Sequence, residues 1–171
     1  MKKLIPDFYA KSIYVLEPSF FLSHGFKYIL CDLDNTLDAF DSLVPSEETI
    51  AYVRKLEASG LKVIIISNNR YKRVYPFASK LNVEFMNGTR KPFGYKIRRF
   101  IKSQKMNSNE VIMVGDQLLT DVLAAKNAKV KVCLTDQLGK RDQIWTFFNR
   151  KIDNHLRGKM IKKGKITRIG G

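Results

Sequence analysis

Residues 28–36 read Tyr-Ile-Leu-Cys-Asp-Leu-Asp-Asn-Thr, and this stretch decides the fold. The apolar run at 28–31 is typical of a buried strand, and Asp32 and Asp34 follow where that strand ends. A chain that coils as it leaves a sheet can bring two alternate side chains into one small volume. Two carboxylates held so close repel each other unless a divalent cation joins them. One could then act as a nucleophile while the other handles protons.

A second strand is predicted at residues 62–66, a short β-branched run that stops at Ser67, Asn68 and Asn69. These residues offer a hydroxyl group and backbone N–H groups to the oxygens of a phosphoryl group. Taken alone, they would more often form a loop or cap a helix.

Further along the chain, Lys91 precedes Pro92, and the apolar run 111–114 leads into Gly115 and Asp116. Proline suits the first position of a helix, and a lysine just before it would place a compact positive charge beside a phosphate. An acidic residue after a glycine turn is well placed to bind a metal ion.

Each of these elements also has an ordinary structural interpretation. Paired aspartates form turns, a lysine such as Lys91 is usually solvated, and Arg90 beside it competes for any phosphate role. What favours a catalytic site is that all of the elements occur together and in order, with every element following a predicted apolar strand.

The motifs resemble those of the haloacid dehalogenase superfamily, whose first motif reads Asp-x-Asp-x-Thr. The longer match Gly-Asp-Gln-Leu-Leu-Thr-Asp at 115–121, and Phe-Asn-Arg at 148–150 before a basic tail, resemble the YqeG family. Its members are cap-less bacterial phosphatases of subclass IIIA, similar to the phosphatidylglycerophosphate phosphatases.

The resemblance implies a role for each matching residue. Asp32 would attack phosphorus, and Asp34 would protonate the leaving group and later activate water. Mg²⁺ would be held by Asp32, the main-chain carbonyl of Asp34, and Asp116. The residues implied to bind phosphate are Ser67, Asn68 and Lys91. Asp121 would orient Lys91 or a metal-bound water.

The alternation of strand and helix patterns predicts an α/β fold, a three-layer, doubly wound, Rossmann-like parallel sheet in a single domain. Strands are expected at 27–31, 62–66, 83–86, 111–114 and 130–134. Helices are expected at 47–58 after the cap Ser46, at 70–80, at 93–102 and at 120–127. Because Pro76 interrupts the second helix, we expect that helix to be kinked or to start late.

The spacing between the motifs leaves no room for an inserted cap domain. An uncapped site suits a bulky substrate, or one presented on a surface that completes the enclosure. We therefore expect residues 1–139 to form the catalytic domain, with 1–25 as an N-terminal extension that flanks the site. Residues 140–171 form a basic, aromatic C-terminal helix and tail.

That tail carries 10 basic and 2 acidic residues, in a chain with a net charge of +15. Trp145, Phe147 and Phe148 precede Ile152, Leu156 and Met160 at helical spacing, which is typical of a helix at the surface of an anionic membrane. A helix packed on the domain by this face is an equally good interpretation. Nucleic acid is the rival partner, but the end of the tail lacks aromatic residues that stack on bases.

Two cysteines, Cys31 and Cys133, fall in apolar strands and indicate core residues in a reducing compartment. We expect a cytoplasmic protein, peripheral on the inner face of the plasma membrane. The first hypothesis is a magnesium-dependent phosphatase that converts phosphatidylglycerophosphate to phosphatidylglycerol. The alternatives are a soluble phosphatase for nucleotide, sugar or polynucleotide phosphates, and a non-catalytic basic module that binds RNA or a membrane.

Overall fold

A computed structural model describes residues 4–139 and 144–169, with the backbone alone for residues 144–149. Its parallel sheet has the strand order β4-β3-β2-β5-β6-β1-β7. The strands are β1 (Phe8–Ala10), β2 (Tyr28–Asp32), β3 (Lys62–Ile66), β4 (Glu84–Met86), β5 (Val111–Gly115), β6 (Lys131–Thr135) and β7 (Arg168–Ile169). The helices are α1 (Pro18–Ser23), α2 (Glu47–Ala58), α3 (Tyr71–Leu81), α4 (Tyr95–Ser103), α5 (Leu123–Ala128) and α6 (Ile144–Lys162).

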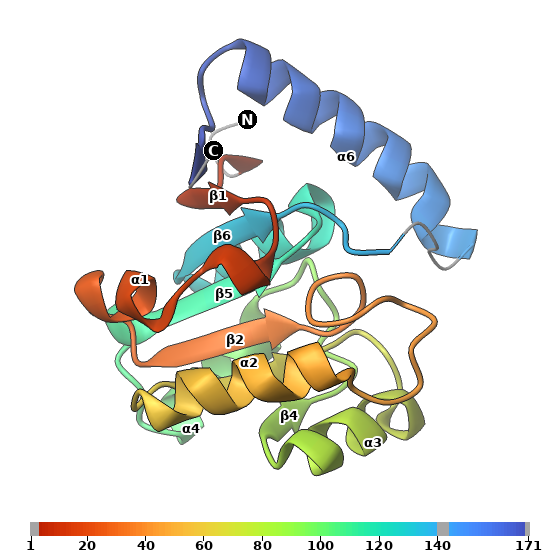
Figure 1. Cartoon of the computed structure of the whole chain (residues 1–171). Helices are drawn as coiled ribbons and strands as arrows, with labels where there is room; N and C mark the ends of the chain where they lie inside the picture. Colours follow the sequence, from red (N-terminus) through yellow and green to blue (C-terminus); the bar gives the residue numbers. More distant parts are fainter. Residues whose placement is uncertain (1–3, 140–143, 170–171) are drawn as a thin grey trace.

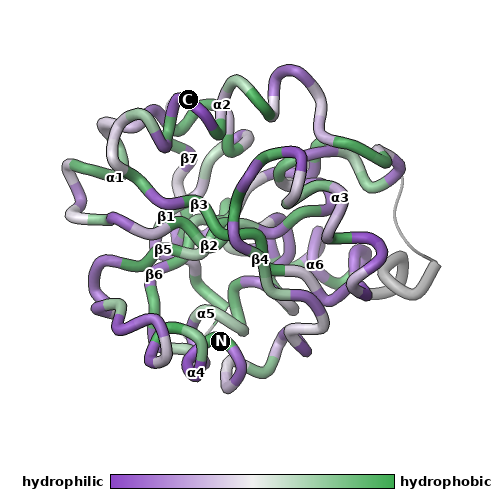
Figure 2. Tube along the Cα trace, turned by 90° about the horizontal axis from the view of Figure 1, so that it is seen from below, coloured by the Kyte–Doolittle hydropathy of each residue, from purple (hydrophilic) through white to green (hydrophobic). Residues whose placement is uncertain are grey.

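Alternate residues of the central strands face opposite sides of the sheet and build two cores. Ile29, Cys31 and Ile65 pack with residues of α1, α2 and α3 on one side. Leu30 and Ile64 pack with residues of α4, α5 and α6 on the other. This arrangement gives three layers (Figure 1), with hydrophobic residues following the strands through the middle of the molecule (Figure 2). The predicted α/β parallel fold is confirmed.

The five predicted strands are β2 to β6, and each agrees with the structure to within one residue at either end. The helix predicted at 47–58 is α2, and the Ser46 side chain caps it by accepting a hydrogen bond from the backbone N–H of Thr49 at 3.2 Å. The helix predicted at 120–127 begins earlier, because a π-helical turn, η4 (Leu118–Val122), runs directly into α5.

The structure bears on two expectations about prolines. Helix α3 begins at Tyr71 and continues past Pro76 to Leu81, so the alternative that it starts late is wrong. Pro92 does not open a helix, since α4 begins at Tyr95 after Gly94. Gly94 is needed there because a Cβ atom at this position would lie 2.4 Å from the backbone nitrogen of Ala128.

Two segments that were not predicted as strands, one near each end of the described chain, also belong to the sheet. Strand β1 lies in the predicted N-terminal extension and pairs with β6, and β7 from the basic tail pairs with β1. Asp7 fastens this edge by ion pairs with Lys126 at 2.6 Å and with Lys131 at 3.0 Å. Among the described residues, no helix is long and apolar enough to cross a membrane.

Candidate active site

The site lies at the carboxyl ends of β2, β3 and β5, which are neighbours in the sheet. Asp32 is the last residue of β2, and Asp34 lies just beyond it in a tight loop. Asn35 has a left-handed backbone with φ of 62°, and its side-chain oxygen accepts a hydrogen bond from the backbone N–H of Phe40 at 3.1 Å. Buried Leu33 and Leu37 anchor the same loop in the core, so the loop is fixed against the sheet.

Lys91 is the positive centre of the site. Its ammonium group donates hydrogen bonds to Asp32 and, at 2.7 Å, to Asp121, and only 8% of the residue is exposed. Burial opposes the charge of Lys91, but the ion pairs with Asp121 and Asp32 outweigh burial and raise its pKa. Arg90, the predicted competitor, is exposed and does not line the pocket.

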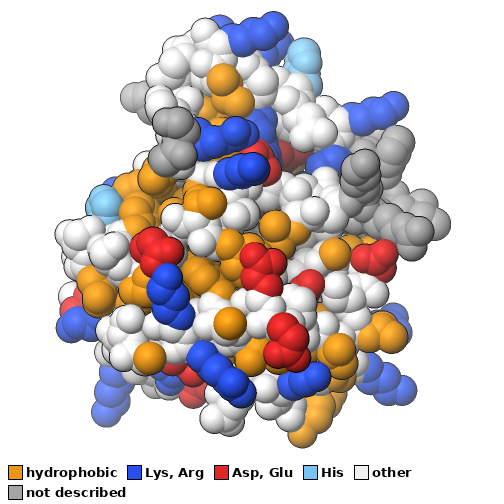
Figure 3. Space-filling model, in the orientation of Figure 1, with side chains coloured by type: hydrophobic (Ala, Val, Ile, Leu, Met, Phe, Trp, Pro, Cys, Tyr) orange, Lys and Arg blue, Asp and Glu red, His pale blue; other side chains and the backbone are white. Residues whose placement is uncertain are grey.

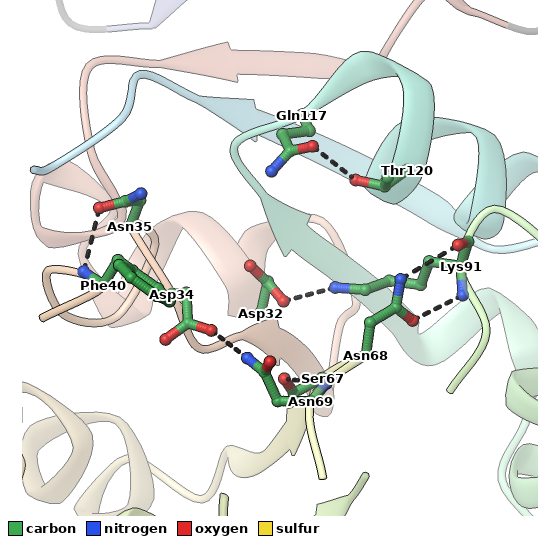
Figure 4. Close-up of a pocket in the computed structure, with 10 residues that line it drawn as sticks. All are labelled: Asp32, Asp34, Asn35, Phe40, Ser67, Asn68, Asn69, Lys91, Gln117 and Thr120. Atoms are coloured by element: carbon green, nitrogen blue, oxygen red, sulfur yellow. Dashed lines mark hydrogen bonds and ion pairs between the residues drawn. The ribbon is translucent and has the colours of Figure 1, made fainter. Parts of the chain in front are cut away.

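The side chain of Asn68 holds both the backbone N–H and the backbone carbonyl of Lys91. Its side-chain oxygen accepts a hydrogen bond from the backbone N–H of Lys91 at 2.7 Å, and its amide donates to the Lys91 carbonyl at 3.1 Å (Figure 4). One hydrogen of the Asn68 amide is used in this way, so its second amide hydrogen and its backbone N–H are the donors that could contact a phosphate. Buried Ser67 lies beside it and lines the pocket.

Asp34 turns away from Asp32. Its carboxylate accepts hydrogen bonds from the side chains of Asn69 and of Arg73 in α3, the latter at 2.7 Å (Figure 4 shows the Asn69 contact). Burial raises the pKa of Asp34, and the charge of Arg73 opposes that rise. The sequence motifs did not predict a role for Arg73, although it lies in the first turn of the helix that follows the Ser-Asn-Asn motif.

Three buried carboxylates, Asp32, Asp116 and Asp121, gather with one oxygen of each within 4.8 Å of the others. Such oxygen donors are the ligands that Mg²⁺ prefers, so the residues present fit this ion. Asp34 adds no carboxylate to the cluster, which leaves its main-chain carbonyl as the implied ligand. Burial raises the pKa of Asp116 to about 6, although the charge of Arg150 opposes this rise. Burial also raises the pKa of Asp32, and there the charge of Lys91 opposes the rise.

Gly115 makes this cluster sterically possible. A Cβ atom at that position would lie 2.4 Å from the Cγ atom of Asp121 and 2.7 Å from one of its carboxylate oxygens. Only glycine therefore lets the Asp121 carboxylate fold back against the end of β5, where it meets Lys91.

The pocket above these residues has a volume of about 90 Å³. Pockets that enclose whole small-molecule ligands occupy roughly 300–1,000 Å³, so this one suits a phosphoryl group rather than an entire substrate. Its lining residues are Asp32, Asp34, Asn35, Phe40, Ser67, Asn68, Asn69, Lys91, Gln117 and Thr120 (Figure 4).

Comparisons with known proteins agree with this geometry. The model of the haloacid dehalogenase-like hydrolase family matches residues 30–135. A Bacillus subtilis protein named probable phosphatase YqeG is 31% identical over 165 residues, which cover 96% of each chain.

Two solved structures share the fold. A cobalt-bound deoxy-D-mannose-octulosonate 8-phosphate phosphatase of Haemophilus influenzae has a TM-score of 0.52 at 12% identity, over 79% of this chain and 89% of that one. A 3-deoxy-D-manno-octulosonate 8-phosphate phosphatase of Yersinia pestis has a TM-score of 0.51 at 14% identity, over 67% and 75% of the chains.

Proposed function

Since this chain belongs to the haloacid dehalogenase-like hydrolase family and is a phosphatase, we propose that it uses Mg²⁺ to hydrolyse phosphatidylglycerophosphate to phosphatidylglycerol. The observation that carries the proposal is the small, open pocket, which has room for a phosphoryl group at Asp32 but none for the body of a substrate. The remainder of the substrate must stay outside the pocket, as a lipid held in a membrane would.

The proposed reaction has two steps, in which Asp32 and Asp34 play different parts. The Asp32 carboxylate attacks phosphorus, and the glycerol oxygen leaves with a proton from Asp34. Asp34 then takes a proton from the water that hydrolyses the acyl phosphate on Asp32, which releases inorganic phosphate and restores the Asp32 carboxylate. Because burial raises the pKa of Asp34, its protonated form persists to higher pH than in an exposed aspartate.

Two side chains and the metal ion would stabilise the transferring phosphoryl group. Lys91 and Ser67 line the pocket and would hold its equatorial oxygens. Mg²⁺, bound by Asp32 and Asp116, would offset the negative charge that accumulates between the nucleophile and the phosphate.

The loop that carries Phe40 supports a membrane-bound substrate. Phe40 lines the pocket, and Leu43 and Val44 follow it on the same loop with 81% and 51% of their surfaces exposed. Solvent-exposed apolar side chains on a loop that reaches an open site favour contact with lipid.

Exposed basic residues would add an electrostatic attraction to an anionic membrane. Lys159, Lys162 and Lys163 are exposed near the end of α6, and Figure 3 shows basic side chains around this helix. Each basic residue near an anionic surface contributes about 1 kcal/mol. The predicted membrane contact of Trp145, Phe147 and Phe148 concerns side chains that lie outside the described part of the chain.

The test is Mg²⁺-dependent phosphate release from phosphatidylglycerophosphate in mixed micelles, compared with water-soluble sugar and nucleotide phosphates. We expect the lipid to have the highest kcat/KM.

Replacing Leu43 and Val44 together by Ser should lower turnover of the micellar lipid roughly 10-fold, since each loses apolar contact with the micelle. The same variant should hydrolyse p-nitrophenyl phosphate at the wild-type rate. Equal or better turnover of soluble phosphates by the wild type would overturn the lipid assignment and favour a soluble phosphatase.

A further inference from the structure

The C-terminal helix α6 reaches the candidate metal site through three charged side chains, which are Arg150, Asp153 and Arg157. All three are buried, with 8%, 1% and 9% of their surfaces exposed. Burial of a charged side chain is unfavourable unless each charge finds partners, and a helix needs only apolar residues to pack on a sheet. The groups that these three side chains contact therefore indicate why charged residues are buried at these positions.

Asp153 caps the turn that follows Asp116. One of its carboxylate oxygens accepts hydrogen bonds from the backbone N–H groups of Leu118 at 2.5 Å and of Leu119 at 3.3 Å. These are the first residues of η4, and Gln117 at its N-terminal end makes no side-chain cap. N–H groups at a helix start have no partner within the helix, so Asp153 supplies the missing acceptor from a distant part of the chain.

Arg157 holds the main chain of Asp116 itself. One nitrogen of its guanidinium group donates to the Asp116 carbonyl at 2.5 Å and lies 3.2 Å from the Asp153 carboxylate. The other nitrogen donates to the Thr135 carbonyl at 3.1 Å and to Asp136 at 3.0 Å. Arg157 thus joins the end of β5 to the end of β6 at the point where the chain leaves the sheet.

Arg150 completes the contact at the carboxylate end. Its guanidinium nitrogen lies 2.7 Å from a carboxylate oxygen of Asp116, which is fully buried. The backbone and the side chain of Asp116 are therefore both held by residues of α6.

We propose that Asp153 and Arg157 are positioning residues. They hold residues 116–119, here called the Asp116 loop, so that the carboxylate of Asp116 faces Asp32. This inference rests on the proposed use of a divalent cation. It assigns the basic C-terminal helix a part in metal binding, in addition to any contact with a membrane. Neither residue lines the pocket, and each acts through the loop that carries Asp116.

The test is the affinity for Mg²⁺ alone, measured by isothermal titration calorimetry on the full chain. We expect Asp153→Ala and Arg157→Leu to weaken Mg²⁺ binding roughly 10–100-fold, as loss of a group that supports a metal ligand does. Arg157→Lys should recover part of this loss, because an ammonium group can still donate to the Asp116 carbonyl. At saturating Mg²⁺, kcat should fall while KM stays close to the wild-type value.

The matched control is Arg168→Leu. Arg168 lies in the same C-terminal segment and pairs with Asp136 at 2.6 Å, but it makes none of the contacts with the Asp116 loop described above. This variant should lower the melting temperature yet keep Mg²⁺ affinity within about two-fold of the wild type, a change too small to indicate a lost ligand support. If Asp153→Ala or Arg157→Leu does not fold, the more conservative variants Asp153→Asn and Arg157→Lys replace them. We expect these variants to lose Mg²⁺ affinity too, but by a smaller factor.

Two outcomes would contradict the inference, and they are distinguishable. A wild-type protein that binds no Mg²⁺ overturns the proposed cation and this inference with it. A wild-type protein that binds Mg²⁺, with loop variants that bind it equally well and are merely less stable, overturns the inference alone.

Discussion

Asp32→Asn is expected to lower phosphate release by at least about 10³-fold, because an amide cannot replace the carboxylate that forms the covalent bond to phosphorus. The side chain lies at the end of β2, at the floor of the pocket, with Lys91 as its partner. Initial rates with p-nitrophenyl phosphate at saturating Mg²⁺ measure the effect without any requirement for a lipid interface.

The control for this variant is its fold. Asparagine has nearly the same shape as aspartate, and its carbonyl oxygen can still accept a hydrogen bond from Lys91. We therefore expect a cooperative urea transition like that of the wild type. A well-folded Asp32→Asn protein with more than about a tenth of wild-type activity would show that another group attacks phosphorus.

Lys91→Met is expected to affect stability and activity together. It leaves Asp32 and Asp121 buried without their cation, and removing one partner of a buried ion pair costs about 3–5 kcal/mol. Phosphate release should fall roughly 10²–10³-fold, since the positive group that holds the phosphoryl oxygens is lost. Urea unfolding and initial rates measure the two effects.

The sign of the pH dependence follows from the same charges. Burial raises the pKa of Asp32, and Lys91 is the cation that lowers it, so without Lys91 this pKa rises further above its unfolded value. A group of this kind contributes stability at pH values below its unfolded pKa and loses it as pH rises through its folded pKa. The deficit of Lys91→Met should therefore shrink as pH falls. Arg90→Met, at the exposed neighbouring position, should change stability by no more than about 0.5 kcal/mol.

The central strands could be predicted because each is a continuous apolar run that ends at a polar residue. Strand β2, buried on both faces, is typical, and its end at Asp32 fixes the place of the site. Strand β1, at Phe8–Ala10, could not be predicted in the same way. It is only 3 residues long, and its position depends on pairing with β6, far away in the sequence.

The polar contacts around the motifs were missed for a related reason. Arg73, Asp153 and Arg157 lie on helices, where a charged residue is usually solvated, and nothing local distinguishes them from exposed neighbours such as Lys72 and Lys159. Their partners become visible only once the strands are placed side by side. Sequence motifs could locate Asp32, Lys91 and Asp116, and also Asn68 and Asp121, which contact Lys91. They could not show which residues of α3 and α6 hold Asp34 and Asp116.

The most direct test of the account is to trap the phosphoryl group on Asp32. The Asp34→Asn variant lacks the base that activates water, while p-nitrophenol leaves without needing a proton from an acid. With p-nitrophenyl phosphate and Mg²⁺, it should release one equivalent of p-nitrophenol rapidly and then turn over slowly. Mass spectrometry after acid quenching should find a phosphoryl group on the peptide containing Asp32, and none when Asp32 is also replaced by Asn. A linear release of p-nitrophenol, with no phosphorylated peptide or with phosphate on another residue, would contradict the account.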